Sequence, residues 1–225
     1  MPLWNEVPIH VLDFEGSTRT GVVEYGVATL HGGEITATAT RLCRPIAPVP
    51  RIDTQCHGLS DADLAGAAPL AEDWDFFSGW RRSGLFAAHH APTEHGLLKT
   101  AWPYPGAMPD HARANGAAVN DWGPWIDTCR LSAQWCPRLS AHKLGVLVEW
   151  FRLEKKLAGL ARLHCPPARC RYHCALYDAL AGALLLRHLC AQPERIGITL
   201  EELVRGSLGG SRHSERIQGE MDFLW

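Results

Sequence analysis

Five residues in three separate segments have side chains that could bind divalent cations and move a proton. Asp13 and Glu15 lie two positions apart, Glu94 lies far along the chain, and His173 precedes Asp178 by five positions. Carboxylate oxygens are hard ligands that suit Mg²⁺ or Mn²⁺, and a neutral histidine can act as a general base. Four carboxylates can hold two such ions about 3.5–4 Å apart, which is an arrangement suited to phosphodiester cleavage.

Each of these residues also has an ordinary structural explanation when it is taken alone. Strand ends often carry acids, which covers Asp13 and Glu15, and the helix dipole favours an acid such as Glu94 near a helix start. A histidine at the position of His173 is more often a surface or capping residue. Asp178 is harder to explain, because the expected packing of its helix turns it away from solvent among Leu and Ala. The five residues together are therefore stronger evidence for a metal site than any one of them alone.

Composition indicates one globular domain. The chain has 225 residues, of which 46% are hydrophobic and 20% charged, enough for one sizeable core. We find neither an apolar run that could span a bilayer nor a signal peptide at the N-terminus, so we expect a cytoplasmic protein without a membrane partner. A net charge of −2 argues against binding nucleic acid through a large basic surface. It does not exclude a nuclease whose phosphate contacts run through bound metal.

The eight cysteines allow two interpretations. Cys165, Cys170 and Cys174, interleaved with His164 and His173, could form a zinc site. Their spacings differ from the paired Cys-x2-Cys arrangement of strong zinc motifs, and a cytosolic chain of this size does not need disulfides. We therefore favour free thiols, partly or fully buried, and keep a small zinc protein as an alternative.

Strand patterns occur in the first and middle parts of the chain. Residues 9–14 form an apolar run typical of a buried central strand. Residues 21–30 and 34–40 flank two glycines that can form a tight turn, so they predict a hairpin whose partner strand is antiparallel to the rest. Residues 85–88 and 125–128 predict two further short strands.

Helical patterns alternate with these strands. Proline and acids at residues 69–73 predict a helix that continues to about residue 82, and Pro92 opens the helix that carries Glu94. Residues 144–151 predict an amphipathic helix, and residues 173–189 a longer one whose alanines, four apart, allow close packing on a sheet. We therefore predict a single α/β domain with a mixed sheet over residues 1–205, followed by a loosely ordered tail at 206–225.

The long segment 102–123 has three prolines and little periodicity, which is typical of a functional or mobile loop. Trp102, Tyr104, Trp122 and Trp125 could stack on bases of a single strand. We favour the interpretation that most of them pack this loop against the domain.

Three motifs resemble those of the DnaQ-like 3′–5′ exonucleases of the DEDDh class, in the ribonuclease H-like superfamily. VLDFE at 11–15 resembles the first motif, Asp-x-Glu; AHHAPTE at 88–94 resembles the second, His-Asn-Ala-x-Phe-Asp; HCALYDA at 173–179 resembles the third, His-x-Ala-x-x-Asp-Ala. Weaker similarities occur at 57–59, 126–128 and 143–144. The resemblance covers about residues 9–189 and implies a mixed five-stranded sheet with one antiparallel strand, flanked by helices.

The resemblance also implies a function: metal-dependent hydrolysis at the 3′ end of single-stranded DNA or RNA, releasing nucleoside 5′-monophosphates. By analogy, two Mg²⁺ or Mn²⁺ ions are held by four carboxylates and His173 is the general base; the metal ligands are Asp13, Glu15, Glu94 and Asp178. A homodimer is possible, as is a polymerase or repair partner that the sequence does not identify. The family's substrate contacts transfer to Phe14, Gly16, Ser17, His57, Leu59 and His90.

The second motif departs from the family pattern. Glu94 replaces Asp and is one methylene longer, while His90 and Thr93 replace Asn and Phe. We interpret the chain as an active variant, since Glu remains a hard anionic ligand. A weaker or metal-selective enzyme is one alternative, and an inactive nucleic-acid-binding module of the same fold is the other.

Overall fold

The computed structural model describes residues 1–113 and 117–208. Its centre is a mixed five-stranded sheet in the order β3-β2-β1-β4-β7. β2 runs antiparallel to β1 and β3, whereas β1, β4 and β7 are mutually parallel, as the sequence predicted. The strands are β1 (Ile9–Ser17), β2 (Gly21–His31), β3 (Glu34–Leu42), β4 (Leu85–Ala88) and β7 (Trp125–Asp127).

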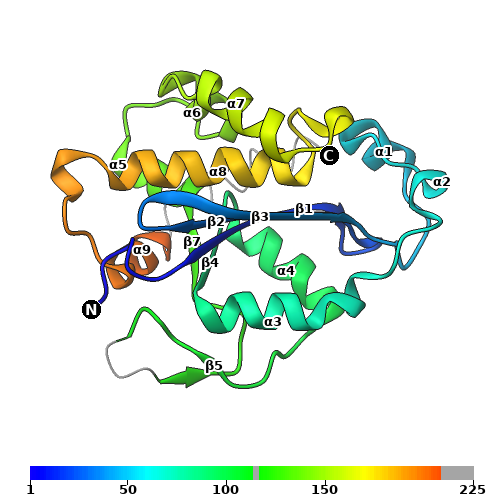
Figure 1. The fold of residues 1–225 in the computed structure, drawn as a ribbon, viewed down its shortest axis with the longest axis horizontal. Helices are drawn as coiled ribbons and strands as arrows, with labels where there is room; N and C mark the ends of the chain where they lie inside the picture. Colours follow the sequence, from blue (N-terminus) through cyan, green and yellow to red (C-terminus); the bar gives the residue numbers. More distant parts are fainter. Residues whose placement is uncertain (114–116, 209–225) are drawn as a thin grey trace.

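Helices cover both faces of this sheet (Figure 1). One face is covered by α8, which contacts β1, β2 and β3 and has α6 and α7 packed on it. The opposite face is covered by α3 and α4. The helices are α1 (Arg51–His57), α2 (Asp61–Leu64), α3 (Trp74–Ser83), α4 (Ala91–Ala101), α5 (Thr128–Trp135), α6 (Leu144–Trp150), α7 (Glu154–His164), α8 (Ala175–Cys190) and α9 (Leu200–Ser207).

The alternation of side chains along β1 assigns its residues to two faces. Ile9 and Val11 belong to the core beneath α8, while Leu12 and Phe14 belong to the aromatic-rich core beneath α3 and α4. Because side chains two apart share a face, Asp13 and the residues in register with it on β2 face α8. The acids of β1 therefore lie on the α8 side of the sheet.

Gly26 of β2 sets how close α8 comes to the sheet. Gly26 pairs with Asp13 in the β1–β2 register. A Cβ on Gly26 would lie 2.2 Å from the backbone carbon of Ala175, the first residue of α8. Only glycine permits this approach, so the helix start that follows His173 lies directly over the strand pair that carries Asp13.

The long segment after α4 is packed rather than open. Trp122 is fully buried, Trp125 is buried, and the Trp102 and Trp122 rings lie 5.8 Å apart. Tyr104, in contrast, is 74% exposed. Within this segment the described residues include a two-stranded pair, β5 (Met108–Pro109) and β6 (Ala118–Val119).

Several element boundaries differ from the sequence predictions. Helices α1, α7 and α9 were not predicted from the pattern, and the first turn of the helix at 69–82 is a 3₁₀ segment, Leu70–Asp73. The first two residues of the tail predicted at 206–225 belong to α9, which extends to Ser207, and the buried Ser207 hydroxyl accepts a hydrogen bond from the Asp127 N–H. Residues 209–225 of the predicted tail lie outside the described residues.

The cysteines are free thiols in the structure. Cys165, Cys170 and Cys174 are not among the groups of three or more potential metal ligands that the described residues bring together. This finding disfavours the zinc protein built on that cluster. None of the described helices combines the length and the apolar character that crossing a membrane requires.

Candidate active site

The third motif meets the first at the start of α8. Potential ligand atoms of Glu15, His173 and Asp178 all lie within 4.8 Å of one another. The backbone N–H of His173 donates to Asp178 Oδ2 over 2.8 Å, so the carboxylate and the histidine are positioned together. His173 precedes α8 rather than lying within it, with a left-handed backbone φ of 60°. That turn leaves His173 exposed beside buried Asp178.

Glu94 reaches the same place from the opposite face of the sheet. Its side chain is buried, and its Oε2 accepts a 2.8 Å hydrogen bond from the backbone N–H of Phe14, between Asp13 and Glu15. The start of α4 is held in turn by Asp127, whose Oδ2 accepts from the Ala91 N–H over 3.1 Å. The extra methylene of Glu94 is thus used to reach the strand backbone.

The acids influence one another strongly. Burial raises the pKa of Asp13 well above its ordinary value, and the charges of Asp178, Glu94 and Glu15 raise it further. Burial followed by the charge of Asp178 has the same effect on the pKa of Glu15. Burial raises the pKa of Glu94 to about 8 and that of Asp178 to about 7, against hydrogen bonds from backbone N–H groups that lower both. Four carboxylates therefore share one charged environment.

This environment fits divalent cations. Asp178 Oδ1 is buried and has no hydrogen-bond partner within the described residues. In the part of the chain that the structure describes, none of the four carboxylates forms a salt bridge. Buried charges of one sign are costly without compensation, and a buried polar atom without a partner requires an explanation such as an ion. The four carboxylates offer hard oxygen donors, which suit Mg²⁺ or Mn²⁺.

A fifth acid, Glu24, lies against this site but was missed from the sequence. Glu24 is opposite Glu15 in the β1–β2 register and is 2% exposed. Its carboxylate forms a salt bridge with Arg169 and accepts the Ala175 N–H at the start of α8 over 3.0 Å. Arg169 also donates to the carbonyl of His57 over 2.6 Å. The ion pair thus ties together β2, the end of α1 and the start of α8.

Glu24 had a recognisable signal in the sequence. It interrupts an otherwise apolar strand pattern at 21–30, and an acid on a buried strand needs a partner. Arg169 had no comparable signal, because it lies 145 positions further along the chain and only the fold brings it to Glu24.

Some residues predicted to contact substrate have side chains that contact other protein residues. Phe14 is buried with its ring 5.9 Å from that of Phe77, and Leu59 packs with Val23 and Leu64. The Ser17 hydroxyl lies 3.0 Å from that of Thr20. Hydrophobic packing buries the side chains of Phe14 and Leu59, and their predicted contacts with substrate stay predictions.

Gly16, His90 and His57 have more distinctive settings. Gly16 has a φ of 128° at a bulge in β1, and a Cβ there would lie 2.2 Å from the Gly21 carbonyl oxygen. His90 is half-buried immediately before α4. His57 Nδ1 accepts the Leu59 N–H over 3.1 Å, so its Nε2 carries the proton. That Nε2 is buried without a hydrogen-bond partner among the described residues.

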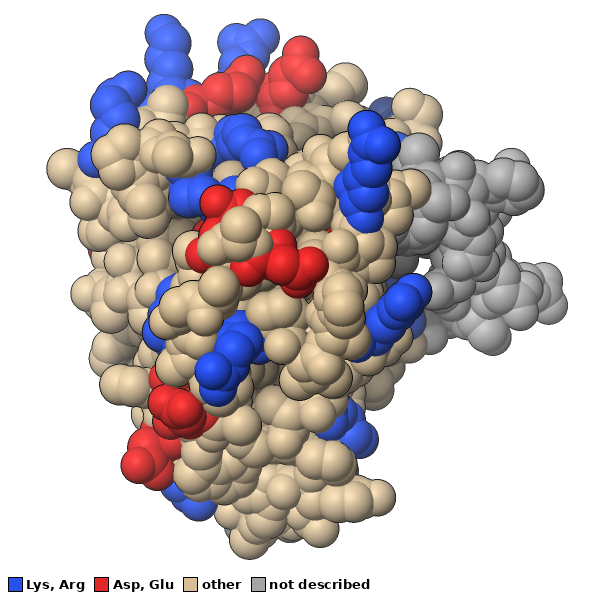
Figure 2. Space-filling view, turned by 90° about the vertical axis from the view of Figure 1, so that its right-hand side faces the viewer, with Lys and Arg blue, Asp and Glu red and all other residues tan. Residues whose placement is uncertain are grey.

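The site lies toward one end of the molecule. The loop before α8 contacts the end of α1, because the Arg171 guanidinium donates to the His57 carbonyl over 3.4 Å. Figure 2 looks onto the end of the molecule where α1 and α2 lie in Figure 1. Acidic side chains gather near the middle of this face, and Lys and Arg side chains lie around them (Figure 2).

Comparisons with known proteins agree with the predicted family resemblance. No family model matches the chain. In sequence it is 23% identical over 195 residues to the PolC-type DNA polymerase III of Bacillus subtilis, an alignment that covers 87% of this chain and 12% of that protein. The chain thus spans only about an eighth of the length of this relative.

Two solved structures share the fold. Exonuclease X in complex with 5′ overhanging duplex DNA superimposes with a TM-score of 0.63 at 22% identity, covering 88% of this chain and 99% of that one. The nuclease domain of 3′hExo, described as a DEDDh family member bound to rAMP, gives a TM-score of 0.60 at 14% identity, covering 87% and 96%. The predicted resemblance to DnaQ-like DEDD exonucleases and the ribonuclease H-like fold are confirmed.

Proposed function

We propose, from the premise that this is a DnaQ-like exonuclease-like domain, that the chain hydrolyses phosphodiester bonds at the 3′ end of single-stranded DNA or RNA. The products are nucleoside 5′-monophosphates. The observation that carries the proposal is the gathering of four mutually repelling carboxylates beside a histidine from three distant segments. A fold gains nothing in stability from such a group unless cations compensate it.

The four carboxylates of Asp13, Glu15, Glu94 and Asp178 would hold Mg²⁺ or Mn²⁺. When bound, these cations supply positive charge that offsets the charge developing on the scissile phosphate. Asp178 offers its unpartnered Oδ1, while its Oδ2 stays on the His173 N–H. Glu94 keeps one oxygen on the Phe14 N–H, which limits how far its carboxylate can turn.

His173 would act as the general base. Burial and the charge of Arg171 lower the pKa of its ring, so the ring is neutral near pH 7 and can accept a proton. The water oxygen attacks phosphorus, its proton passes to a His173 ring nitrogen, and the bond from phosphorus to the 3′-oxygen of the preceding nucleotide breaks. That oxygen takes up a proton from solvent and becomes the new 3′-hydroxyl.

His57 offers a binding group for the end of the strand. Its Nε2–H is buried and has no partner within residues 1–113 and 117–208, and the charge of His173 is among the influences on its pKa. A donor beside the reaction centre can bind an oxygen of the terminal nucleotide. His57→Phe removes this donor at similar volume, and we expect KM for the oligonucleotide to rise.

A digestion series tests the proposal. The substrates are matched DNA and RNA oligonucleotides labelled at the 5′ end, single-stranded or paired to leave a 5′ overhang, each with Mg²⁺, Mn²⁺ or EDTA. We expect a ladder that shortens from the 3′ end, nucleoside 5′-monophosphates by chromatography, and no reaction with EDTA. Saturable binding of every substrate without any product would reject the hydrolase and support the inactive binding module.

A further inference from the structure

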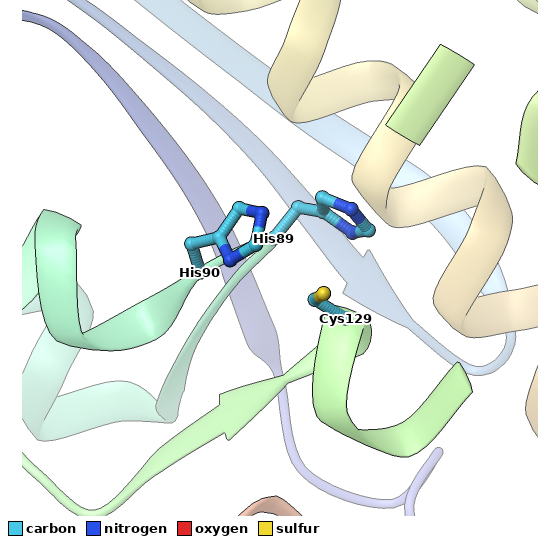
Figure 3. Close-up of side chains that lie close together, drawn as sticks. All are labelled: His89, His90 and Cys129. Atoms are coloured by element: carbon cyan, nitrogen blue, oxygen red, sulfur yellow. The ribbon is translucent and has the colours of Figure 1, made fainter. Parts of the chain in front are cut away.

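A second group of potential metal ligands lies outside the acidic site. It consists of His89, His90 and Cys129, whose ligand atoms all lie within 4.8 Å of one another. The side chains come from the end of β4, the residue before α4 and the first turn of α5 (Figure 3). Both histidines are half-buried and Cys129 is 1% exposed. The group therefore joins the turn between β4 and α4 to α5, which lies about 40 positions further along the chain.

His89 is already oriented as a metal ligand would be. Its Nε2 lies 2.8 Å from the carbonyl oxygen of His142, which can only accept, so Nε2 carries the proton. Nδ1 is then unprotonated and lies 2.9 Å from the Thr128 hydroxyl. Metal-binding histidines commonly donate their second ring N–H to a backbone carbonyl, which fixes the tautomer and orients the ring. The Thr128 hydroxyl has another acceptor in reach, the Ala88 carbonyl at 3.4 Å, if a metal takes its place on Nδ1.

His90 has an unusual backbone for a residue with a side chain. Its φ of 106° and ψ of 59° lie in a region that glycine adopts freely and other residues seldom do. The His89 and His90 ring centroids are 5.0 Å apart with the planes at 75°. Adjacent residues in a regular strand or helix would not present both rings to one neighbour, so this turn is what brings the second imidazole beside Cys129.

We propose that His89, His90 and Cys129 form a binding site for a thiophilic divalent cation, of which Zn²⁺ is the natural candidate. Two imidazoles and a thiolate are typical zinc ligands, and three protein ligands leave the fourth tetrahedral position to water. Ligand atoms around a tetrahedral zinc lie about 3.3–3.6 Å apart, and those of this cluster lie within 4.8 Å of one another, so binding requires at most a small contraction.

The site is distinct from the acidic cluster in its donors. Mg²⁺ and Mn²⁺ prefer oxygen, whereas the thiolate of Cys129 and the imidazole nitrogens favour zinc. Both sites connect to α4, since His90 precedes its first residue and Glu94 lies in its first turn. A bound zinc would join the start of α4 to α5, while Glu94 is positioned separately by the Phe14 N–H.

Cobalt(II) substitution tests this site directly. Metal-free full-length protein carrying Asp13→Asn is titrated with Co²⁺ in excess Mg²⁺, and absorption is followed. A cysteine ligand produces a thiolate-to-cobalt charge-transfer band that oxygen ligands cannot produce. We expect this band to saturate at one equivalent of Co²⁺ and to disappear when Zn²⁺ is added.

Two variants assign the ligands. Cys129→Ser should remove the band, and His90→Asn should weaken Co²⁺ binding by at least about 10²-fold, since loss of a residue that merely supports a ligand can have that effect. Asn suits the left-handed backbone at position 90, so this variant is expected to fold. Cys165→Ser, which changes a buried thiol outside the site, should leave the band unchanged.

The proposal is overturned by either of two results. One is the absence of any charge-transfer band in protein whose circular dichroism shows it to be folded. The other is a band that survives Cys129→Ser or is lost in Cys165→Ser, since this places the cation on another thiol. Neither result depends on whether the protein hydrolyses nucleic acid.

Discussion

His90 and Glu94 are four positions apart at the start of α4, and they belong to two clusters with opposite donor chemistry. On one side Glu94 joins Asp13, Glu15 and Asp178, an all-oxygen group whose members raise one another's pKa values. On the other side His90 joins a second imidazole and a buried thiol. The acidic group is destabilising without cations, because its charges repel. The histidine–cysteine group is neutral without a metal, because burial lowers the pKa values of His89 and His90 and raises that of Cys129. Only the acidic group therefore makes the stability of the metal-free protein depend strongly on pH.

The largest expected effect is a loss of hydrolysis when the acidic group is changed but not when the histidine–cysteine group is changed. Asp13→Asn removes a charge from the acidic group, and we expect hydrolysis to fall by about 10³-fold, corresponding to several kcal/mol of transition-state stabilisation. His173→Ala should cost about 10²–10⁴-fold as loss of a general base. Cys129→Ser should leave hydrolysis in Mg²⁺ within about twofold, the change that about 0.4 kcal/mol produces. Equal losses in Asp13→Asn and Cys129→Ser would show that the clusters work as one unit.

Arg169 compensates the charge of Glu24, the buried acid that lies beside the four carboxylates of the acidic group. Arg169→Met leaves Glu24 buried without its cation, opposite Glu15. Removing one partner of a buried ion pair typically destabilises a protein by about 3–5 kcal/mol. Urea unfolding of the metal-free protein should show this loss, with Arg162→Met on the exposed side of α7 as the matched control. A loss no larger than that of the control would mean that Glu24 is compensated in another way.

The acidic group should also make metal-free stability depend on pH. Burial raises the pKa of Glu94 from 4.5 to about 8 in the folded state. Its protonated form is therefore favoured by folding, and the stability it contributes is present below pH 4.5 and is lost as pH rises toward 8. The loss over this window is on the order of 5 kcal/mol.

Glu94→Gln isolates that contribution, because amide and carboxyl have nearly the same shape. The difference in unfolding free energy between wild type and Glu94→Gln, measured in EDTA, should change in favour of the variant as pH rises through this window. Saturating Mg²⁺ should abolish the change, since the cation binds the ionised carboxylate. A difference that is flat with pH in EDTA would contradict the electrostatic account of the site.

The smallest expected effect concerns the length of the residue-94 side chain. Glu94→Asp restores the family's residue but withdraws the carboxylate from the Phe14 N–H. We expect kcat to fall by about 10-fold, because displacements of about 1 Å in an active site can cost up to 10²-fold. The ratio of rates in Mn²⁺ and Mg²⁺ should change as well, whereas Thr93→Ser next to it should not alter that ratio. A faster Glu94→Asp enzyme would show that the longer side chain restrains activity.

Much of the fold was evident in local patterns. The apolar run at residues 9–14, the two glycines at 32–33 and the alanine spacing of the last helix predicted a central strand, the antiparallel hairpin and the helix that crosses the sheet. These features depend on neighbouring residues, so a short window contains them. Helices α7 and α9 were missed although both are amphipathic, because they are short and bury few residues; the capping box of Thr199 and Glu202 was a local signal for the start of α9.

The amino-acid sequence alone determined the ligand types and their order: hard carboxylates in three motifs, with a histidine before the last. Tertiary structure decided which of them meet and what neutralises them. Glu24 forms its ion pair with Arg169, which lies 145 positions later in the chain. Gly26 allows α8 to pack close to the strand that carries Asp13. Cys129 lies beside two histidines that are 39 and 40 positions earlier in the sequence. The physical reason is that periodicity and composition depend on residues close together in sequence. The neutralisation of a buried charge depends instead on distances between residues far apart in sequence, and these distances exist only in the folded chain.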